Sequence, residues 1–218
     1  MTLALFDLDN TLLGGDSDHA WGEFLISQGL VDAEHYQQAN DQFYRDYQAG
    51  TLNIHTYLAF ALKPLTRFSQ SQLTDLHRSF MDSHITPLLQ PKARSLIEHH
   101  RAQGHTLMII TATNRFITAP IAERFGVPHL LATEPEVIEN RYTGKIVGTP
   151  CFQEGKVVRL RQWLESSGHS LYGSYFYSDS ANDLPLLELV DNPVAVDPDE
   201  RLRAWAEQRG APVVSLRS

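Results

Sequence analysis

Short apolar runs of strand type alternate with longer helix-like runs along most of this chain, and that alternation constrains the fold most. The strand-like runs are 3–6, 106–110, 174–177, 194–196 and 213–215. The helix-like runs are 92–103, 115–125, 156–166, 183–190 and 199–209. Alternating strands and helices build a parallel sheet with helices on both faces. We therefore expect an α/β fold with a doubly wound parallel sheet, and a small hairpin at 136–139 and 141–147.

The stretch from 16 to 89 departs from this alternation because it contains no convincing strand. Four helical segments fit it instead, at 18–28, 33–48, 54–62 and 72–83. We expect a Rossmann-like core made of 1–15 and 90–218, with a helical cap domain, 16–89, inserted after the first strand. Ligands of open α/β sheets bind beyond the carboxyl ends of the strands. A module inserted there is positioned to close over such a site.

Composition and charge argue against several kinds of partner. The 218 residues carry 26 acidic and 18 basic side chains, for a net charge of −8, which disfavours nucleic acid. No apolar run approaches the length of a membrane span, and no leader-like segment is recognisable before the first strand. The single cysteine suits a reducing compartment. We therefore expect a cytoplasmic protein without a membrane partner. The ten histidines show no metal-ligand spacing, and His99 and His100 are expected on a helix surface.

The run Asp-Leu-Asp-Asn-Thr follows the first strand directly, at 7–11. Carboxylates two residues apart at a strand end can reach one point above the sheet. One can act there as a nucleophile and metal ligand, and the other as a general acid. Clustered carboxylates repel each other unless a cation lies between them. The alternative is a strand-end turn whose aspartates cap the next segment.

Two further features fall at helix starts. Thr111 lies in a turn that follows a strand-like run, where a hydroxyl and free main-chain N–H groups suit an oxyanion such as phosphate. An ordinary helix cap is the alternative for that turn. Lys156 begins another helix, where a cation is locally unfavourable. Either a bound anion accounts for this lysine, or it is an exposed residue without a role.

An acidic turn follows the strand-like run 174–177. Asp179 is expected beside Asp7 if their two strands are neighbours. Asn182 and Asp183 can orient ligands or waters from the same turn. Asp183 can instead be only an acid at a helix N-terminus.

The order of these features along the chain resembles the motifs of the haloacid dehalogenase superfamily of phosphohydrolases. The features are an aspartate pair, then a hydroxyl, then a lysine and then an acidic turn. The matching residues are, in motif order, Asp7-x-Asp9-x-Thr11, Thr111, Lys156 and Asp179-x-x-Asn182-Asp183. The resemblance covers the whole chain, and the position of the helical insert is most similar to the phosphoserine phosphatase-like branch. That branch usually has glycine on both sides of the first acid of the fourth motif, where this chain has serine.

This resemblance implies a Mg²⁺-dependent phosphomonoesterase that forms an aspartyl-phosphate. Asp7 is the implied nucleophile, and Asp9 is implied to protonate the leaving alcohol and then to deprotonate water. The implied metal ligands are Asp7, the main-chain carbonyl of Asp9, and Asp179. Thr111 and Lys156 are implied to bind phosphoryl oxygens. Ala112 and Asn182 are also expected to contact the substrate. Asp183 is expected to orient the metal ligands without binding the metal itself.

The resemblance also places substrate recognition at the start of the cap, where Asp16, Asp18 and Trp21 are expected to contact a small phosphate monoester. Phosphoserine phosphatases hold the substrate amine with an acid at the position of Asp16. They also grip the substrate carboxylate with an arginine, and we align Ala59 with that arginine. An amine-bearing ester without a carboxylate therefore fits better, and histidinol phosphate is our first expectation. Arg45 could replace the missing arginine, which keeps phosphoserine open.

Several alternatives stay open on the sequence alone. Phosphocholine and phosphoethanolamine also suit an acidic, aromatic pocket. Aromatic side chains of the cap could stack on an imidazole or simply pack the cap helices; these are Trp21, Phe43, Tyr44, Tyr47 and Phe60. A non-catalytic phosphoester-binding protein and a phosphotransferase, in which an alcohol replaces water, are the competing classes.

Overall fold

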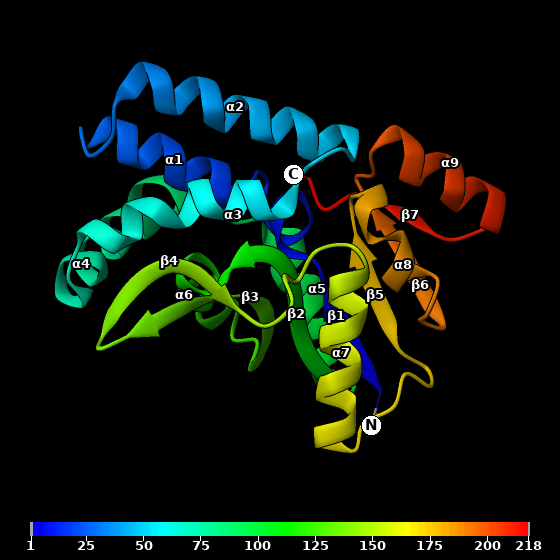
Figure 1. Ribbon diagram of the computed structural model, residues 1–218. Coiled ribbons are helices and arrows are strands. Elements are labelled where there is room, and N and C mark those ends of the chain that lie inside the picture. Colours follow the sequence, from blue (N-terminus) through cyan, green and yellow to red (C-terminus); the bar gives the residue numbers. More distant parts are fainter. Residues whose placement is uncertain (1, 218) are drawn as a thin grey trace.

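One mixed sheet forms the centre of the computed structural model, which describes residues 2–217. Within these residues the strands lie in the order β4-β3-β2-β1-β5-β6-β7 (Figure 1). All neighbours pair in parallel except β3 and β4, which are antiparallel. The strands are β1 (Leu3–Phe6), β2 (Thr106–Asn114), β3 (His129–Ile138), β4 (Arg141–Val147), β5 (Tyr175–Ser178), β6 (Asn192–Val196) and β7 (Val213–Val214).

Strand β1 shows why the central strands are continuously apolar. Ala4 and Phe6 belong to a buried cluster that includes residues of the helices α5 (Pro91–Ala102) and α6 (Arg115–Phe125). Leu3 and Leu5 belong to a second cluster with residues of α7 (Glu154–Ser167), α8 (Leu184–Leu187) and α9 (Glu200–Arg209). Successive side chains of a strand point to opposite faces, so a strand covered on both faces needs apolar residues throughout. The predicted doubly wound α/β sheet is confirmed.

The helices follow the predicted pattern closely. Gly50, in the left-handed conformation at φ 73°, ends α2. Ser69 and Gln72 form a reciprocal capping box at the start of α4. The helices are α1 (Ser17–Ser27), α2 (Ala33–Ala49), α3 (Ile54–Leu62), α4 (Gln70–Phe80), α5 (Pro91–Ala102), α6 (Arg115–Phe125), α7 (Glu154–Ser167), α8 (Leu184–Leu187) and α9 (Glu200–Arg209).

Helices α1 to α4 all lie in the chain between β1 and β2. In Figure 1, α1, α2 and α3 lie across the end of the sheet opposite to the N-terminus, which is the end where β1 finishes. A single antiparallel bridge between Leu13 and Leu89 joins the points where the chain leaves and re-enters the sheet region. On this basis we propose that 16–89 acts as a cap domain over a core of 1–15 and 90–218.

Three elements differ from the prediction. The strand expected at 106–110 continues to Asn114, so Thr111 lies inside β2 and not in a turn after it. The strand expected at 136–139 is the end of β3, whose first residues pair in parallel with β2 before the strand turns to pair with β4. Pro135 lies inside β3, at a shift of register, and a proline weakens a strand prediction. The helix expected at 183–190 is only the short α8, preceded by the tight turn Ala181–Asp183.

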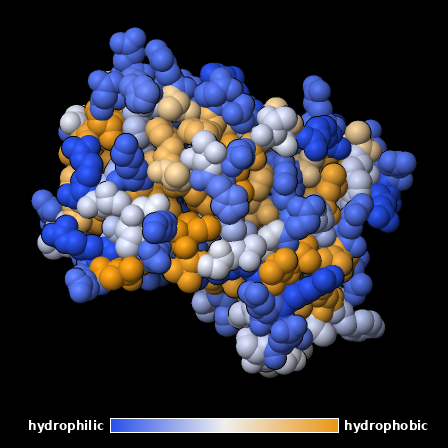
Figure 2. All heavy atoms as spheres, viewed as in Figure 1, coloured by the Kyte–Doolittle hydropathy of each residue, from blue (hydrophilic) through white to orange (hydrophobic). Residues whose placement is uncertain are grey.

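The surface shows no single dominant apolar face in the view of Figure 2, where apolar side chains form separate groups among hydrophilic ones. The tip of the β3–β4 hairpin carries two exposed apolar side chains, Val137 and Ile138. None of the helices in residues 2–217 combines the length and the hydropathy that a membrane span requires.

Candidate active site

The two aspartates of the first motif lie in a tight turn at the carboxyl end of β1. The main-chain N–H of Asp7 donates to the carbonyl of Tyr177 on the neighbouring β5, at 2.9 Å. Asn10 adopts the left-handed conformation, at φ 58°, which reverses the chain within the turn. Both carboxylates are buried, with Asp7 3% and Asp9 8% exposed. The turn thus holds two acids at the end of the central strand, as the sequence predicts.

Lys156 connects this turn with the fourth motif. Its Nζ lies 2.6 Å from Oδ1 of Asp7 and 2.7 Å from Oδ1 of Asp183. The lysine is 1% exposed, so the alternative of an exposed residue without a role is wrong. The two carboxylates raise the pKa of Lys156, although burial alone would lower it. This buried ion pair explains a lysine in the first turn of α7.

Burial also raises the pKa of Asp7, to about 7, while the Lys156 ammonium opposes that rise. Asp9 has different partners. It accepts hydrogen bonds from the N–H of Ser17 at 2.7 Å and from the hydroxyl of Thr113 at 2.8 Å. Burial, followed by the charge of Asp16, raises the pKa of Asp9 to about 6. A carboxyl group with a pKa near 6 can both give and take a proton close to neutral pH.

The second motif lies at the end of β2, next to the first. Thr111 and Ala112 both line the same pocket as Asp7. The Thr111 hydroxyl accepts a hydrogen bond from the N–H of Thr113 at 3.2 Å. Asn114, not Thr111, caps α6, because its side chain accepts from the N–H of Ile117. The Thr111 hydroxyl can therefore still donate a hydrogen bond into the pocket.

The fourth motif brings a second carboxylate close to Asp7. The Thr11 hydroxyl lies 2.9 Å from Oδ1 of Asp179 and 3.2 Å from Oδ2 of Asp7. Burial, followed by the charge of Asp7, raises the pKa of Asp179 well above its usual value. Asp183 lies behind this pair, and its carboxylate accepts from Ser178 Oγ at 2.7 Å. The predicted neighbourhood of Asp7, Asp179 and Asp183 thus exists in the fold.

These donors fit Mg²⁺ by their chemistry. Mg²⁺ is bound by hard oxygens, commonly one or two carboxylates with several waters. Asp7 and Asp179 repel each other in the absence of a cation, and this repulsion adds to burial in raising the pKa of Asp179. The predicted third ligand is the main-chain carbonyl of Asp9. Within residues 2–217, no three His, Cys, Asp or Glu side chains are arranged to hold a metal ion by themselves. A metal here would depend on the main chain, water and substrate.

Asn182 is not among the residues that line the pocket, and neither are Lys156 and Asp179, so its predicted substrate contact stays a prediction. Its Nδ2 donates to the carbonyl of Tyr47 at 2.9 Å, and its Oδ1 accepts from Gln153 at 3.2 Å. Arg201, on α9, donates to the carbonyl of Ala49 at 3.3 Å. These donors add to the main-chain N–H of Gly50, which also donates to the carbonyl of Tyr47, at 3.0 Å. Asn182 therefore joins the motif turn to the helices above it.

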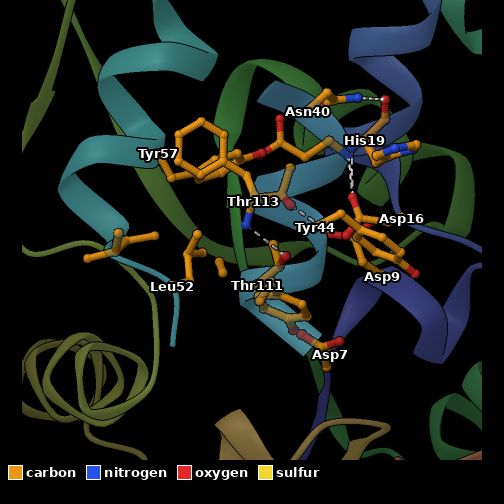
Figure 3. Close-up of a pocket in the computed structure, with 15 residues that line it drawn as sticks. Asp7, Asp9, Asp16, His19, Asn40, Tyr44, Leu52, Tyr57, Thr111 and Thr113 are labelled. Carbon is orange, nitrogen blue, oxygen red and sulfur yellow. Dashed lines mark hydrogen bonds between the residues drawn. The ribbon is translucent and has the colours of Figure 1, made fainter. Parts of the chain in front are cut away.

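The pocket itself lies between the strand ends and helices α1, α2 and α3 (Figure 3). Three groups of residues line it: the motif residues, acids and polar groups of α1 and α2, and a set of aromatic and apolar side chains. The lining residues are Asp7, Asp9, Asp16, Asp18, His19, Asn40, Phe43, Tyr44, Tyr47, Leu52, Ile54, Tyr57, Thr111, Ala112 and Thr113.

The two predicted acids of the cap are both in the pocket. Asp16 N-caps α1 by accepting from the N–H groups of Asp18 and His19, at 2.9 and 2.8 Å. Asp18 is 7% exposed, and it lines the pocket together with Tyr57, whose hydroxyl favours its charged form. Burial raises the pKa of Asp16 to about 6 and that of Asp18 to about 7. Both lie against space that a ligand can occupy.

Trp21 lies outside the pocket lining, so the structure gives no support to the predicted substrate contact. It is 2% exposed and packs edge-on against Phe80 and Phe116, with ring centroids 5.1 and 5.2 Å away. Phe60 stacks on Tyr36 and is also outside the lining. Both side chains serve the helix packing, which was the competing interpretation for these aromatic residues.

Several lining residues were not expected from the sequence. Asn40, Leu52, Ile54, Tyr57 and Thr113 reach the pocket from four different segments. Thr113 is the one that a sequence signal could have indicated, because it lies two residues beyond the hydroxyl of the second motif. The others belong to no motif, and only the packing of α2 and α3 brings them here.

Comparison with known proteins gives a consistent result. A family model described as haloacid dehalogenase-like hydrolase matches residues 4–188. A histidinol-phosphatase from Neisseria meningitidis serogroup C (strain 8013) is 48% identical over 219 residues, which cover 99% of this chain and 99% of the relative. A crystal structure of a protein with unknown function from Bordetella pertussis Tohama I is 46% identical, with a TM-score of 0.93 over 99% of this chain and 100% of that chain.

A structure described as a phospho-aspartyl intermediate analogue of phosphoserine phosphatase shares the fold. Its TM-score is 0.71 at 17% identity, over 99% of this chain and 93% of that chain. The match of the family model and the 48% identity to a full-length relative extend over most of the chain. The chain therefore belongs to the haloacid dehalogenase-like hydrolases.

Proposed function

We propose that this phosphatase hydrolyses histidinol phosphate, with Mg²⁺ as cofactor and an aspartyl-phosphate as intermediate. The Neisseria relative, 48% identical, is a histidinol-phosphatase, which supports this choice of substrate. The geometry of the motif residues supports the type of reaction. The pocket is lined on one side by the motif residues at the strand ends and on the other by residues of the helical segment. This arrangement supports a small phosphate ester whose phosphate faces the motif residues and whose other groups face the helices.

The charge of the pocket is the observation that carries the proposal. Four of its lining side chains are carboxylates, and within residues 2–217 no lysine or arginine lines it. A substrate carboxylate would be buried there without a partner, at a high free-energy cost. A substrate ammonium would instead offset part of the negative charge. Histidinol phosphate has an ammonium group and an imidazole but no carboxylate.

The same observation weighs against phosphoserine. Arg45 is exposed and donates to Gln42 at 2.9 Å, away from the pocket. Ala59 is also exposed and outside the lining, so that position does not decide the question by itself. What disfavours phosphoserine is the lack of any Lys or Arg side chain among the lining residues that the structure describes.

In the proposed reaction, Asp7 attacks phosphorus and Asp9 gives its proton to the leaving alkoxide. The raised pKa of Asp9, about 6, keeps a useful fraction of it protonated near neutral pH. Asp9 then takes a proton from the water that hydrolyses the aspartyl-phosphate. Its hydrogen bonds to Ser17 and Thr113 hold the carboxylate in place through both steps.

Lys156 and Thr111 are proposed to stabilise the phosphoryl oxygens as charge develops on them. Lys156 is already held by Asp7 and Asp183, so its ammonium needs little reorganisation. Bound Mg²⁺, held by Asp7, Asp179 and the carbonyl of Asp9, would supply positive charge that lets a carboxylate approach a phosphate dianion.

Phosphate release measured with purified protein and Mg²⁺ tests the proposal. Histidinol phosphate and p-nitrophenyl phosphate are the substrates, and Asp7→Asn is the blank. We expect the wild type to release phosphate from both, and EDTA or Asp7→Asn to abolish release. A folded wild type that releases none from either substrate would contradict the proposal. Release that depends on an added acceptor alcohol would instead indicate a phosphotransferase.

A further inference from the structure

Among the described residues, Asp18 is the pocket carboxylate that accepts no main-chain N–H and pairs with no lysine or arginine. Asp7 has the Lys156 ammonium at 2.6 Å, and Asp16 accepts from two main-chain N–H groups. Asp9 accepts from one N–H and one hydroxyl. The groups that favour the charged carboxylate of Asp18 are the Tyr57 hydroxyl and, more weakly, His19, and the residue is 7% exposed. A buried carboxylate in this state costs free energy unless a cation or further donor joins it.

The surroundings of Asp18 differ from those of the other pocket acids because they are aromatic. Tyr57 lies edge-on to Phe43, with ring centroids 5.3 Å apart. Leu52 and Ile54 line the pocket from the segment just before Tyr57. In Figure 3, Tyr57 projects from α3 at one end of the pocket, and Asp7 lies at the other. This end therefore combines one acid with flat and apolar surfaces, away from the nucleophile.

A role as a helix N-terminal acid does not account for Asp18. Such an acid interacts favourably with the helix dipole and needs no burial to do so. Asp18 is buried instead, and Asp16 already accepts the hydrogen bonds of the first N–H groups of α1. Burial raises the pKa of Asp18 to about 7, and the Tyr57 hydroxyl and His19 oppose this rise only in part.

We infer that Asp18 and Tyr57 form a specificity-determining pair that binds a ring N–H of a flat, basic heterocycle in the substrate. This inference rests on the proposed function and deepens it, because it assigns the imidazole to this pair and leaves the aliphatic ammonium to Asp16. A carboxylate binds imidazolium, or the N–H of neutral imidazole, by a charge-assisted hydrogen bond. The Phe43 and Tyr57 rings offer aromatic surface to the heterocycle.

Three substrates separate the ring from the other groups. Histidinol phosphate has a ring and an amine, phosphoethanolamine has only the amine, and p-nitrophenyl phosphate has no basic nitrogen. For Asp18→Asn we expect kcat/KM to fall about 10- to 100-fold on histidinol phosphate, mainly through KM. On the other two substrates we expect a change of no more than about twofold. Tyr57→Phe keeps the ring and should lose about 3- to 10-fold on histidinol phosphate alone.

A matched control is Asp32→Asn, because Asp32 is an exposed N-cap of α2 outside the pocket, and asparagine also caps. Its kinetic constants should equal those of the wild type. Equal losses for Asp18→Asn on all three substrates would overturn the inference, because they would indicate a structural role. Equal losses on histidinol phosphate and phosphoethanolamine would overturn it too, by assigning the aliphatic amine to Asp18.

Binding of histidinol, the dephosphorylated compound, distinguishes failure of this inference from failure of the proposed function. Calorimetry measures this binding without any turnover. We expect Asp18→Asn to bind histidinol about 10- to 100-fold more weakly than the wild type and Asp32→Asn. Weakened binding in an enzyme that hydrolyses nothing would support the pair and refute the proposed reaction. Equal binding by Asp18→Asn and wild type, or no binding by either, would refute the pair.

Discussion

The two sides of the pocket are built in different ways. The floor is formed at the strand ends by the motif residues Asp7, Asp9 and Thr111, which line the pocket. Lys156 and Asp179 belong to it as supporting residues that do not line the pocket themselves. The roof is the set of lining residues from the helical segment: Asp16, Asp18, His19, Asn40, Phe43, Tyr44, Tyr47, Leu52, Ile54 and Tyr57. In the floor, Lys156 directly compensates a carboxylate. In the roof, no lysine or arginine does so within the described chain. The floor therefore holds the residues proposed to carry out the reaction, with a cation already beside one of its carboxylates. The carboxylates of the roof are left without such a cation, and a positively charged group of the substrate can compensate them.

Asp9→Asn is expected to have the largest effect, because it removes proton transfer from the floor. We expect kcat on histidinol phosphate to fall about 10²- to 10⁴-fold. p-Nitrophenolate is a good leaving group that needs no protonation. With p-nitrophenyl phosphate, the variant should therefore give a fast burst of about one equivalent and then a slow steady state. Stopped-flow absorbance measures the burst, and its absence would show that Asp9 is needed for more than proton transfer.

Lys156→Met tests whether the floor depends on its internal charge pairing. The substitution leaves Asp7 and Asp183 buried without their shared cation. We expect the free energy of unfolding at pH 7 to fall by about 3–5 kcal/mol. Urea unfolding measures this loss. Lys145→Met is the control, because Lys145 is exposed and should change stability by no more than about 0.5 kcal/mol. Similar losses for the two variants would show that the ion pair does not stabilise the floor.

His100 supports the floor from below, and it is 2% exposed, which corrects the predicted surface position. Its Nε2 lies 2.8 Å from the Tyr177 hydroxyl, and its Nδ1 lies 2.8 Å from Nδ1 of His105. Burial, followed by the nearby His105 and His99, lowers the pKa of His100 to about 4. An unfolded histidine has a pKa of about 6.5, so between these values the unfolded chain binds a proton that the folded chain does not.

Stability contributed by neutral His100 is therefore lost as pH falls from about 6.5 towards 4. For this group alone we expect a loss of about 2 kcal/mol between pH 7 and pH 5. The buried acids of the pocket act in the opposite direction, so the comparison must be made with His100→Asn. Urea unfolding at both pH values should show a difference of about 2 kcal/mol between the pH dependences of wild type and variant. Parallel pH dependences would contradict the assignment.

Arg201→Ala is expected to have the smallest effect, because it removes only one hydrogen bond that holds the end of α2, a helix of the roof. The side chain donates to the carbonyl of Ala49 at the end of α2, and it is exposed. Asn182 still holds the carbonyl of Tyr47. We expect KM for histidinol phosphate to rise about two- to fivefold, with kcat unchanged. Arg203→Ala, an exposed arginine on the same helix, is the control. Identical KM values for both variants would show that Arg201 does not position the roof.

The floor could be predicted because local sequence determines where its residues lie. Asp7 and Asp9 follow a continuous apolar strand, and the carboxyl ends of parallel strands meet at one edge of the sheet. Asp179 follows the neighbouring strand in the same way. Lys156 was harder to interpret, because a lysine at a helix start has several explanations. Its position in the order of motifs indicated its role, and burial beside Asp7 agrees with it.

The roof could be predicted only in part, because tertiary packing decides which face of each helix meets the pocket. Asp18 and Trp21 are three residues apart and share a face of α1. The sequence does not show that Phe80 and Phe116 cover Trp21 while Asp18 stays at the pocket. Tyr57 belongs to no motif and reaches Asp18 from another helix. Such residues become visible only when the helices are placed in space.

The ratio of kcat/KM for histidinol phosphate to that for phosphoserine, measured with the same Mg²⁺-loaded enzyme, tests the central claim most directly. Both esters offer the floor a primary alkyl phosphate and the roof an ammonium group. Only phosphoserine brings a carboxylate into a pocket lined by four acids without lysine or arginine. Because burying that carboxylate without a partner is costly, we predict a preference for histidinol phosphate of at least about 100-fold. Equal values, or a preference for phosphoserine, would contradict the account.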